Sequence, residues 1–311
     1  MSEKQQTLSA RHLLGIEHLS RTEIETILDV AAGYAKTRHI VKEFDCSYRK
    51  LVAANVFLEP STRTRASFEM AMHRLGLKPL SFDAGSSSLS KGETFMDTIM
   101  TIHAMRPDVM IVRQSETGLL ASAAKEVDCP LINAGDGTGE HPTQALLDAL
   151  TMVQRKKTLE GLKVSIIGDI AHSRVARSNF HLLAKMGANV TAFGPAELMP
   201  HELPEGIAGA SSVEQALDGA DVVMMLRIQF ERMEINPDLD DYLASFGLDQ
   251  EKLKLAKKDA IVMHPGPMNV GTEIAADVAN DKKRAVILDQ VENGVAVRMA
   301  VLDLLTRQFR G

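Results

Sequence analysis

The sequence predicts an α/β protein of two domains, each a mostly parallel sheet flanked by helices, with an active site in the cleft between them at the strand carboxyl ends. The chain has 311 residues, enough for two domains, and is 45% hydrophobic and 24% charged, as ordinary globular proteins are. Short apolar runs alternate with longer amphipathic runs, a pattern typical of crossovers between parallel strands. The alternation pauses at the charged segment Arg155-Lys-Lys-Thr-Leu-Glu-Gly161. We therefore predict domains over residues 1–156 and 157–311.

The first predicted element is a helix that begins at a capping box, Ser20-Arg-Thr-Glu23, in which the two side chains bond each other's backbone N–H groups. Ile24, Ile27 and Leu28 then recur at helical spacing. The predicted strands are 51–58, 79–82, 109–112, 130–132, 163–168, 189–193, 221–226, 260–263 and 285–288. The predicted helices include 64–75, 95–105, 118–126, 142–154, 174–186, 212–217 and 295–308.

Charge and composition exclude several classes of protein. The formal charge of -6 argues against a surface built for nucleic acid or anionic lipid, since both require a positive field. No apolar run approaches the roughly 20 residues of a membrane helix, and the first residues lack a secretory apolar core. Cys46 and Cys129 form no C-x-x-C pattern, which indicates neither a disulfide framework nor a cysteine metal site. We expect a cytoplasmic enzyme.

Cationic groups gather at the predicted carboxyl ends of the strands, where open parallel sheets bind ligands. Arg113 and Arg227 directly follow strands, and Arg174 follows another after a short turn. A fourth strand meets His264-Pro-Gly-Pro267, and a fifth runs into Glu59-Pro-Ser-Thr-Arg-Thr-Arg65. Five such strand ends in an acidic protein indicate a shared crevice that receives an anion.

The sharpest of these segments is Ser61-Thr62-Arg63-Thr64, at the turn from a strand into the helix 64–75. Backbone N–H groups and the helix dipole at such a turn favour a phosphate, the hydroxyls add donors, and a guanidinium can bond two phosphate oxygens. The competing interpretation is an ordinary N-cap followed by solvated arginines. Two arginines packed into one turn favour phosphate binding.

A second glycine-rich turn, Asp136-Gly-Thr-Gly-Glu-His141-Pro142-Thr-Gln144, opens another helix. Pro142 suits the first helical position, which places His141 and Gln144 near the helix start. His141 could polarise a carbonyl oxygen and Gln144 could bind an amide. A capped helix with a structural histidine explains the same residues equally well.

Two kinds of cofactor site are not predicted. The turn Gly168-Asp-Ile-Ala-His-Ser lacks the further glycines of G-x-G-x-x-G, so we reject a dinucleotide site. The ten histidines form no H-x-x-x-H or carboxylate-spaced cluster, so no metal site is indicated. The segment Gly85-Ser-Ser-Ser-Leu-Ser-Lys91-Gly-Glu93 is flexible by composition and suits either a lid or arm that carries a lysine, or a solvated linker.

Taken together, four motifs resemble the carbamoyltransferases, and among them the aspartate type. They are Ser61-Thr-Arg-Thr-Arg65, Ser88-Leu-Ser-Lys91-Gly-Glu93, His141-Pro-Thr-Gln144 and His264-Pro-Gly-Pro267. The similarity runs collinearly from about residue 10 to the C-terminus. Ornithine members carry a cysteine in the turn after the histidine, which this chain lacks, and Arg227-Ile-Gln229 looks like the aspartate type.

The resemblance implies transfer of the carbamoyl group of carbamoyl phosphate to L-aspartate, in pyrimidine synthesis, without metal or cofactor. By motif, Ser61, Thr62, Arg63, Thr64 and Arg113 would hold the phosphate. Thr64, Arg113 and His141 would surround the carbamoyl oxygen, while Gln144 and the carbonyls of Gly266 and Pro267 would accept from the carbamoyl NH₂. Arg174, Arg227 and Gln229 would bind the aspartate carboxylates.

The resemblance also implies an assembly. Lys91, with Ser88 chosen from the run Ser86–Ser88 by its spacing, would enter the site from the adjacent subunit of a homotrimer, and Lys91 would help to bind aspartate. The final helix, about residues 295–308, would pack back on the first domain. The turn His264-Pro-Gly-Pro differs from the H-P-L-P of members that join regulatory chains, which leaves open a larger assembly with regulatory chains or with dihydroorotase.

Three other functions remain to be separated from this one. The nearest is a carbamoyltransferase for ornithine or another amine. A second is a non-catalytic carbamoyltransferase-like scaffold, which would have no reason to retain Arg63, Lys91, Arg113, His141, Gln144, Arg174 and Arg227 together. A third is a phosphate-ester sensor, which would bind carbamoyl phosphate and release no phosphate on addition of aspartate.

Overall fold

The computed structural model divides into two compact α/β units. The first comprises Met1–Leu150 and Glu292–Gly311, and the second comprises Thr151–Val291. The structure describes residues 8–37, 48, 50–83, 92–228 and 242–307. The predicted two-part α/β architecture is confirmed. The division between the units falls within helix α5 (Pro142–Lys156), and the C-terminal residues group with the first unit.

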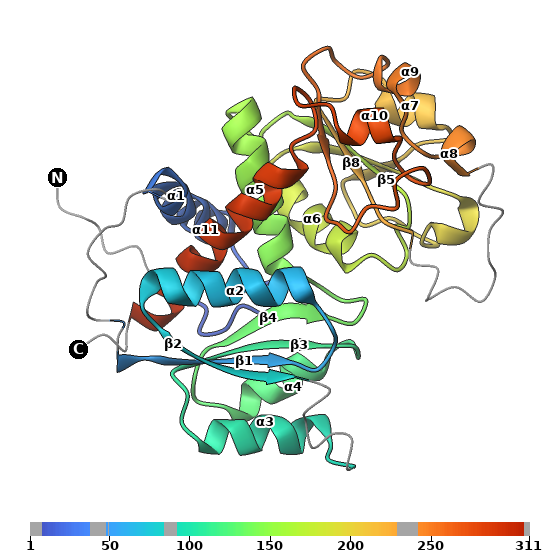
Figure 1. Ribbon diagram of the computed structural model, residues 1–311. Coiled ribbons are helices and arrows are strands. Elements are labelled where there is room, and N and C mark those ends of the chain that lie inside the picture. Colours follow the sequence, from blue (N-terminus) through green and yellow to red (C-terminus); the bar gives the residue numbers. More distant parts are fainter. Residues whose placement is uncertain (1–7, 38–47, 49, 84–91, 229–241, 308–311) are drawn as a thin grey trace. The chain divides into compact units, whose positions relative to one another are not determined.

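The first unit contains a four-stranded sheet in the order β2-β1-β3-β4, with every pair parallel (Figure 1). Its strands are β1 (Val52–Phe57), β2 (Lys78–Asp83), β3 (Val109–Gln114) and β4 (Leu131–Asp136). Because β2 and β3 lie on opposite sides of β1, the strand order reverses beside β1. Open parallel sheets bind their ligands outside the carboxyl ends of the strands at such a point.

Helices cover both faces of this sheet (Figure 1). Ala54 and Val56 of β1 face a buried cluster that includes α3 (Phe95–Ala104) and α4 (Leu119–Glu126). Helix α2 (Thr62–Leu75) contacts β1 and β2 and buries Phe68, Ala71 and Met72 on the other face, as the alternation of side chains along a strand requires.

The first helix, α1 (Arg21–Thr37), has the predicted capping box. Glu23 N–H donates to Ser20 Oγ at 3.2 Å, and Ser20 N–H donates to Glu23 Oε2 at 2.9 Å. Burial raises the pKa of Glu23, but hydrogen bonds from Ser20 and Ser9 outweigh it and lower the pKa to about 2. The carboxylate is therefore held in its charged form.

The second unit contains a five-stranded parallel sheet in the order β7-β6-β5-β8-β9. Helices α7, α9 and α10 contribute to a buried cluster on β5, β8 and β9, and α6 contacts β6. The strands are β5 (Lys163–Ile167), β6 (Asn189–Phe193), β7 (Ile207–Gly209), β8 (Val222–Met225) and β9 (Ile261–Met263). The helices are α6 (Arg174–Lys185), η4 (Ala196–Leu198), α7 (Val213–Leu217), α8 (Tyr242–Ser245), α9 (Gln250–Leu253) and α10 (Ala276–Ala279).

One predicted strand needs correction, and one short strand was not predicted. The strand predicted over 285–288 is wrong: only a single bridge joins Ala285 to Val262, and helix α11 (Ile287–Thr306) begins directly after it. The apolar run suggested a buried strand, but Leu288 is 81% exposed. The short edge strand β7 was missed, because three residues carry too little periodicity to be recognised.

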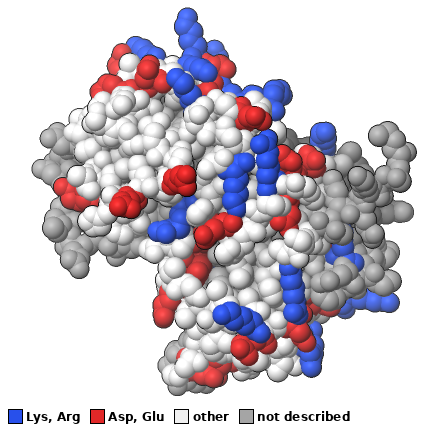
Figure 2. Space-filling view, turned by 180° about the vertical axis from the view of Figure 1, so that it is seen from behind, with Lys and Arg blue, Asp and Glu red and all other residues white. Residues whose placement is uncertain are grey.

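No helix among the described residues is long and apolar enough to cross a membrane. On the face of the molecule shown in Figure 2, lysine and arginine side chains lie among aspartate and glutamate side chains. This mixture agrees with a formal charge of -6 and provides no continuous positive field on that face.

Candidate active site

The anion-binding turn predicted from the sequence lies at the start of α2, directly after β1. Ser61 is the N-cap residue, yet its side chain makes no capping hydrogen bond to the helix. Thr64, one turn in, is buried, whereas Thr62 and Arg63 are exposed. A helix start whose N–H groups are not capped by the serine suits an anionic ligand, because the helix dipole is positive there.

Arg113 lies beside this turn at the end of β3. It is the residue opposite Phe57 in the register of β1 and β3, so it belongs to the strand that was predicted to stop before it. Its Nη2 donates to Glu59 Oε1 at 2.9 Å, and its Nη1 donates to the carbonyl of Ala134 at 3.4 Å. The mostly buried ion pair ties the chain between β1 and α2 to β3 and holds the guanidinium beside the start of α2.

His141 and Gln144 lie at the start of α5, whose first residue is Pro142 as predicted. Both side chains are buried. Gln144 Nε2 donates to Asp148 Oδ1 at 2.9 Å, one helical turn further along. The amide is therefore fixed at one end by a carboxylate.

The turn before His141 is held at several points. Asp136 accepts from Gln114 Nε2 at 2.5 Å and from the N–H of Gly118 at 3.0 Å. Gly137 has a φ of 47°, and a Cβ there would lie 2.7 Å from the backbone nitrogen of Thr117, so only glycine fits.

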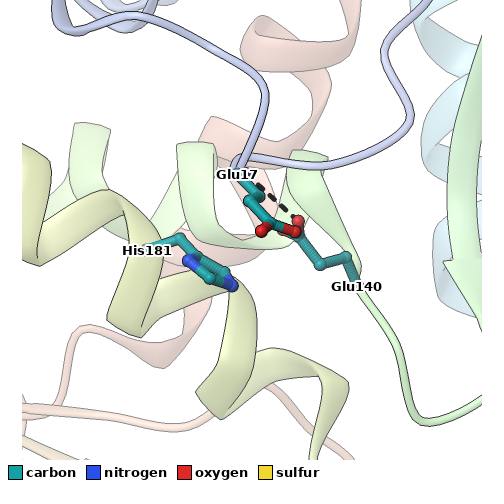
Figure 3. A group of neighbouring side chains, drawn as sticks. All are labelled: Glu17, Glu140 and His181. Carbon is teal, nitrogen blue, oxygen red and sulfur yellow. Dashed lines mark hydrogen bonds between the residues drawn. The ribbon is translucent and has the colours of Figure 1, made fainter. Parts of the chain in front are cut away.

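Glu140 fixes the other side of this turn. Its carboxylate accepts from the N–H of Ile16 at 2.8 Å. It also accepts from the N–H of Glu17 at 3.1 Å (Figure 3). The N-terminal segment thus braces the residue that precedes His141. These contacts fix the residue that directly precedes His141, and with it the backbone from which the imidazole extends.

In the second unit, the two predicted arginines lie at the ends of different strands of one sheet. Arg174 is the first residue of α6, which follows β5, and its helix is capped by Ser173, whose Oγ accepts from the N–H of Ala176 at 3.1 Å. Arg227 follows β8 closely. Both are half-buried. Because β5 and β8 are adjacent, the two guanidiniums belong to neighbouring strand ends.

The turn after β9 is built around His264, which is buried. Its Nδ1 accepts from the N–H of Gly266 at 2.8 Å, so the proton of the neutral ring lies on Nε2, which is 3.1 Å from Glu273 Oε1. Glu273 also accepts from the N–H of Asn269 at 2.5 Å. Gly266 is half-buried, Pro267 is exposed, and the peptide bond between them is cis.

A buried tyrosine lies in the electrostatic field of the same carboxylate. Burial raises the pKa of the Tyr242 hydroxyl, and the charges of Glu273 and Asp169 raise it further. The phenol therefore stays neutral at physiological pH.

The predicted residues fall into three groups. Ser61, Thr62, Arg63, Thr64, Arg113, His141 and Gln144 lie at the carboxyl ends of strands in the first unit. Arg174, Arg227, Gly266 and Pro267 lie after strands of the second. Ser88, Lys91 and Gln229 lie outside the described residues.

The sequence interpretation gave no role to four residues that hold these groups: Glu59, Asp148, Glu273 and Arg298. Asp148 could have been found, since it stands four positions after Gln144 on one face of a helix. Glu59 and Arg298 act across long sequence separations and leave no local signal. Glu273 lies nine positions after His264 in an irregular turn, where no periodicity marks it.

Comparisons with known proteins agree with this architecture. A family model described as the carbamoyl-P binding domain of aspartate/ornithine carbamoyltransferase matches residues 11–154. A second model, described as the Asp/Orn binding domain of the same family, matches residues 160–305.

Full-length relatives are similar throughout. The aspartate carbamoyltransferase catalytic subunit of Rhodospirillum rubrum is 54% identical over 299 residues, covering 95% of this chain and 94% of that protein. The protein of the same name from Dinoroseobacter shibae is 52% identical, covering 98% of this chain and 97% of that protein.

Solved structures share the fold. The aspartate transcarbamoylase of Trypanosoma cruzi, in complex with carbamoyl phosphate and aspartate, is similar with a TM-score of 0.83 at 29% identity, covering 94% of each chain. The ornithine carbamoyltransferase of Pyrococcus furiosus has a TM-score of 0.86 at 29% identity, covering 96% of this chain and 97% of that one. Because the two family models together match residues 11–154 and 160–305, the chain belongs to the aspartate/ornithine carbamoyltransferase family.

Proposed function

We propose that this protein transfers the carbamoyl group of carbamoyl phosphate to the amine of L-aspartate, giving N-carbamoyl-L-aspartate and phosphate. The proposal is supported by relatives named aspartate carbamoyltransferase catalytic subunit at 54% and 52% identity over nearly the whole chain. The geometric observation that carries it is the pairing of an uncapped helix start, at Ser61–Thr64, with Arg113 on the adjacent strand.

The phosphate is bound by the first unit. The N–H groups and hydroxyls at the start of α2 donate to the phosphate oxygens, and the guanidiniums of Arg63 and Arg113 neutralise its charge. Helix N-termini favour anions because their first N–H groups have no partner within the helix. The residues assigned to the phosphate are Ser61, Thr62, Arg63, Thr64 and Arg113.

The carbamoyl group is bound by residues around His141. Thr64, Arg113 and His141 donate to the carbonyl oxygen, where negative charge develops as the amine attacks. Gln144 accepts from the carbamoyl NH₂ through its amide oxygen. The carbonyls of Gly266 and Pro267 accept from the same NH₂.

Aspartate is bound by cations of the second unit. Arg174 and Arg227 pair with its two carboxylates, and Gln229 and Lys91 complete its site. Lys91 and Ser88 come from the adjacent chain of a homotrimer. The reaction belongs to pyrimidine biosynthesis, to which its product N-carbamoyl-L-aspartate is committed, and we place the enzyme in the cytoplasm.

The chemistry requires positioning more than covalent participation by the protein. The amine attacks an activated carbonyl directly, a tetrahedral intermediate forms, and phosphate departs as a stable anion. The protein brings two mutually repelling anions together and stabilises the oxyanion, and both effects lower the barrier. No side chain becomes covalently attached to the carbamoyl group.

A second candidate, transfer to ornithine, is supported by the similarity to the Pyrococcus furiosus ornithine carbamoyltransferase. The two substrates differ in charge away from the reacting amine: aspartate carries two carboxylates, whereas ornithine carries one carboxylate and an α-ammonium group. Paired arginines at neighbouring strand ends, Arg174 and Arg227, favour the dianion.

A ureido-product assay tests both candidates. Purified protein is incubated with carbamoyl phosphate and either L-aspartate or L-ornithine, and product and released phosphate are measured together. We expect stoichiometric product and phosphate with aspartate alone. Turnover of ornithine without aspartate would overturn the substrate assignment, and binding of carbamoyl phosphate without turnover of either amine would indicate a sensor or scaffold.

A further inference from the structure

A buried cluster in the first unit comprises Gln144 and Asp148 of α5 and Arg298 of α11. Asp148 is fully buried, and its Oδ1 accepts the hydrogen bond from Gln144 Nε2 at 2.9 Å. Both residues lie on α5, one turn apart. The cluster contains the Gln144 amide that the proposed function assigns to the carbamoyl NH₂.

The partner of an amide decides which of its ends is presented to a ligand. An ionised carboxylate has no proton to donate, so it can only accept from the NH₂ end of the Gln144 amide. The amide oxygen, Oε1, then points away from Asp148. A neutral amide or acid at position 148 could meet either end and would leave the orientation unspecified.

A buried arginine supplies the opposite charge. Arg298 on α11 is 3% exposed; its Nη1 donates to Ser67 Oγ at 2.9 Å and its Nη2 donates to Thr143 Oγ1 at 3.4 Å. Its guanidinium lies 5.0 Å from the ring centroid of Phe68. These contacts join α2, which begins at the turn Ser61–Thr64, to α5, whose start carries His141 and Gln144.

Asp148 and Arg298 carry opposite charges and interact electrostatically. Burial lowers the pKa of Arg298, the charge of Asp148 raises it, and the charge of Arg113 lowers it again. A guanidinium remains protonated at neutral pH even when buried. An opposite charge nearby favours the ionised form of a buried carboxylate, and Arg298 supplies such a charge in the field of Asp148.

The chain makes room for this guanidinium. At Gly294 of α11, an added Cβ would lie 2.6 Å from Arg298 Nη1 and 3.2 Å from Leu147 Cδ2. A glycine in the middle of a helix costs stability, so its presence here is explained by the space that the arginine occupies.

We propose that Asp148 is a positioning residue that fixes the amide of Gln144 with its oxygen toward the carbamoyl NH₂, and that Arg298 is the buried cation that keeps Asp148 a pure acceptor. The inference rests on the proposed function. It makes Asp148 a determinant of selectivity for carbamoyl phosphate over phosphates that lack an NH₂ group.

Acetyl phosphate provides the test, because it has a methyl group where carbamoyl phosphate has NH₂. The dissociation constants of both compounds are measured by calorimetry for the wild type and for Asp148→Asn. We expect Asp148→Asn to weaken the binding of carbamoyl phosphate by about 3- to 10-fold, the scale of a lost hydrogen bond between neutral groups, and the binding of acetyl phosphate by less than about twofold. If Asp148 had a purely structural role, the substitution would weaken the binding of both compounds equally.

The matched control is Asp303→Asn. Asp303 is a buried carboxylate on the same helix as Arg298, and it accepts from the hydroxyls of Tyr34 and Tyr48, each at 2.9 Å. This variant loses the same charge, so we expect a lower melting temperature and an unchanged ratio of the two dissociation constants. If Asp148→Asn alone does not fold, the two dissociation constants are measured on the double variant Asp148→Asn with Arg298→Met, which removes both buried charges of the cluster.

A double-mutant cycle with Gln144→Ala completes the test. If Asp148 acts through Gln144, then Asp148→Asn has no further effect on selectivity once Gln144 is alanine. With an active wild type, the inference would be overturned if Asp148→Asn weakened the binding of both phosphates equally. Additive effects of the two substitutions in the cycle would also overturn it. A wild type that forms no ureido product would instead count against the proposed function.

Discussion

The two units hold their candidate ligand-binding groups by different means. In the first unit the groups are side chains, and buried charges fix them: Glu59 fixes Arg113 and Asp148 fixes Gln144. In the second unit the groups after β9 are backbone carbonyls, and the turn that carries them is fixed by His264 and Glu273. Substitutions in the first unit should therefore act on ligand binding and rate, whereas those around this turn should act first on stability.

The largest expected effect is on rate, in the first unit. His141→Ala and Arg63→Ala each remove a group aimed at developing or departing negative charge, and we expect kcat to fall by about 10²–10³-fold. Steady-state kinetics with carbamoyl phosphate and aspartate measure it. His73→Ala, on the exposed side of α2, is the control and should leave kcat unchanged. A loss confined to KM would contradict the role assigned to His141.

The next effect is on stability, in the second unit. Glu273→Ala leaves the Nε2–H of His264 and the N–H of Asn269 without their buried acceptor, and we expect a loss of about 3 kcal/mol in the free energy of unfolding. Urea unfolding measures it. Glu273→Gln retains an acceptor oxygen and should recover most of the loss. If the two variants were equally stable, the turn would not depend on these hydrogen bonds.

A smaller effect on stability distinguishes two costs of replacing a glycine in the first unit, backbone strain and steric overlap. Gly137 and Gly118 both have positive φ, but an added Cβ would meet the Thr117 backbone at Gly137 and nothing within 4 Å at Gly118. We expect Gly137→Ala to cost about 2–3 kcal/mol and Gly118→Ala about 1 kcal/mol. Thermal unfolding compares them. Equal costs would show that conformational strain alone matters at this turn.

The smallest effect concerns the capping box of α1. Folding lowers the pKa of Glu23 from 4.5 to about 2, so its contribution to stability is fully present above about pH 4.5 and is lost as the pH falls toward 2. Because the carboxylate is largely solvated, we expect less than about 1 kcal/mol. Glu23→Gln should be less stable than the wild type at pH 7 and equally stable near pH 2. A difference that persists at pH 2 would contradict a charge-dependent cap.

The fold was predictable because it rests on local periodicity. Alternating apolar runs and amphipathic helices predicted the strands of both sheets except the short edge strand β7, and the cations after the strands marked the candidate site. The strand predicted over 285–288 is wrong because this apolar run forms only one bridge, from Ala285 to Val262 of β9, before α11 starts. Propensity alone cannot tell where tertiary pairing stops.

The residues that support the site were mostly not predictable. Arg298 reaches Ser67 across 231 positions of the chain, and Arg113 reaches Glu59 across 54. Such contacts depend on the packing of α11 against the first unit and on strand order. The residues assigned to the ligands were recognisable by motif, whereas the residues that contact and hold them became visible only in three dimensions.

Binding of N-phosphonacetyl-L-aspartate tests the central claim most directly, because the compound joins a phosphonate to an aspartate. The account predicts a melting temperature that rises with ligand concentration, by an amount equivalent to about 2.7 kcal/mol at a hundredfold excess over Kd. It also predicts that Arg63→Ala in the first unit and Arg227→Ala in the second each greatly reduce the shift. No shift at saturating ligand, or a full shift that survives either substitution, would contradict an enzyme in which each unit binds one of the two anions.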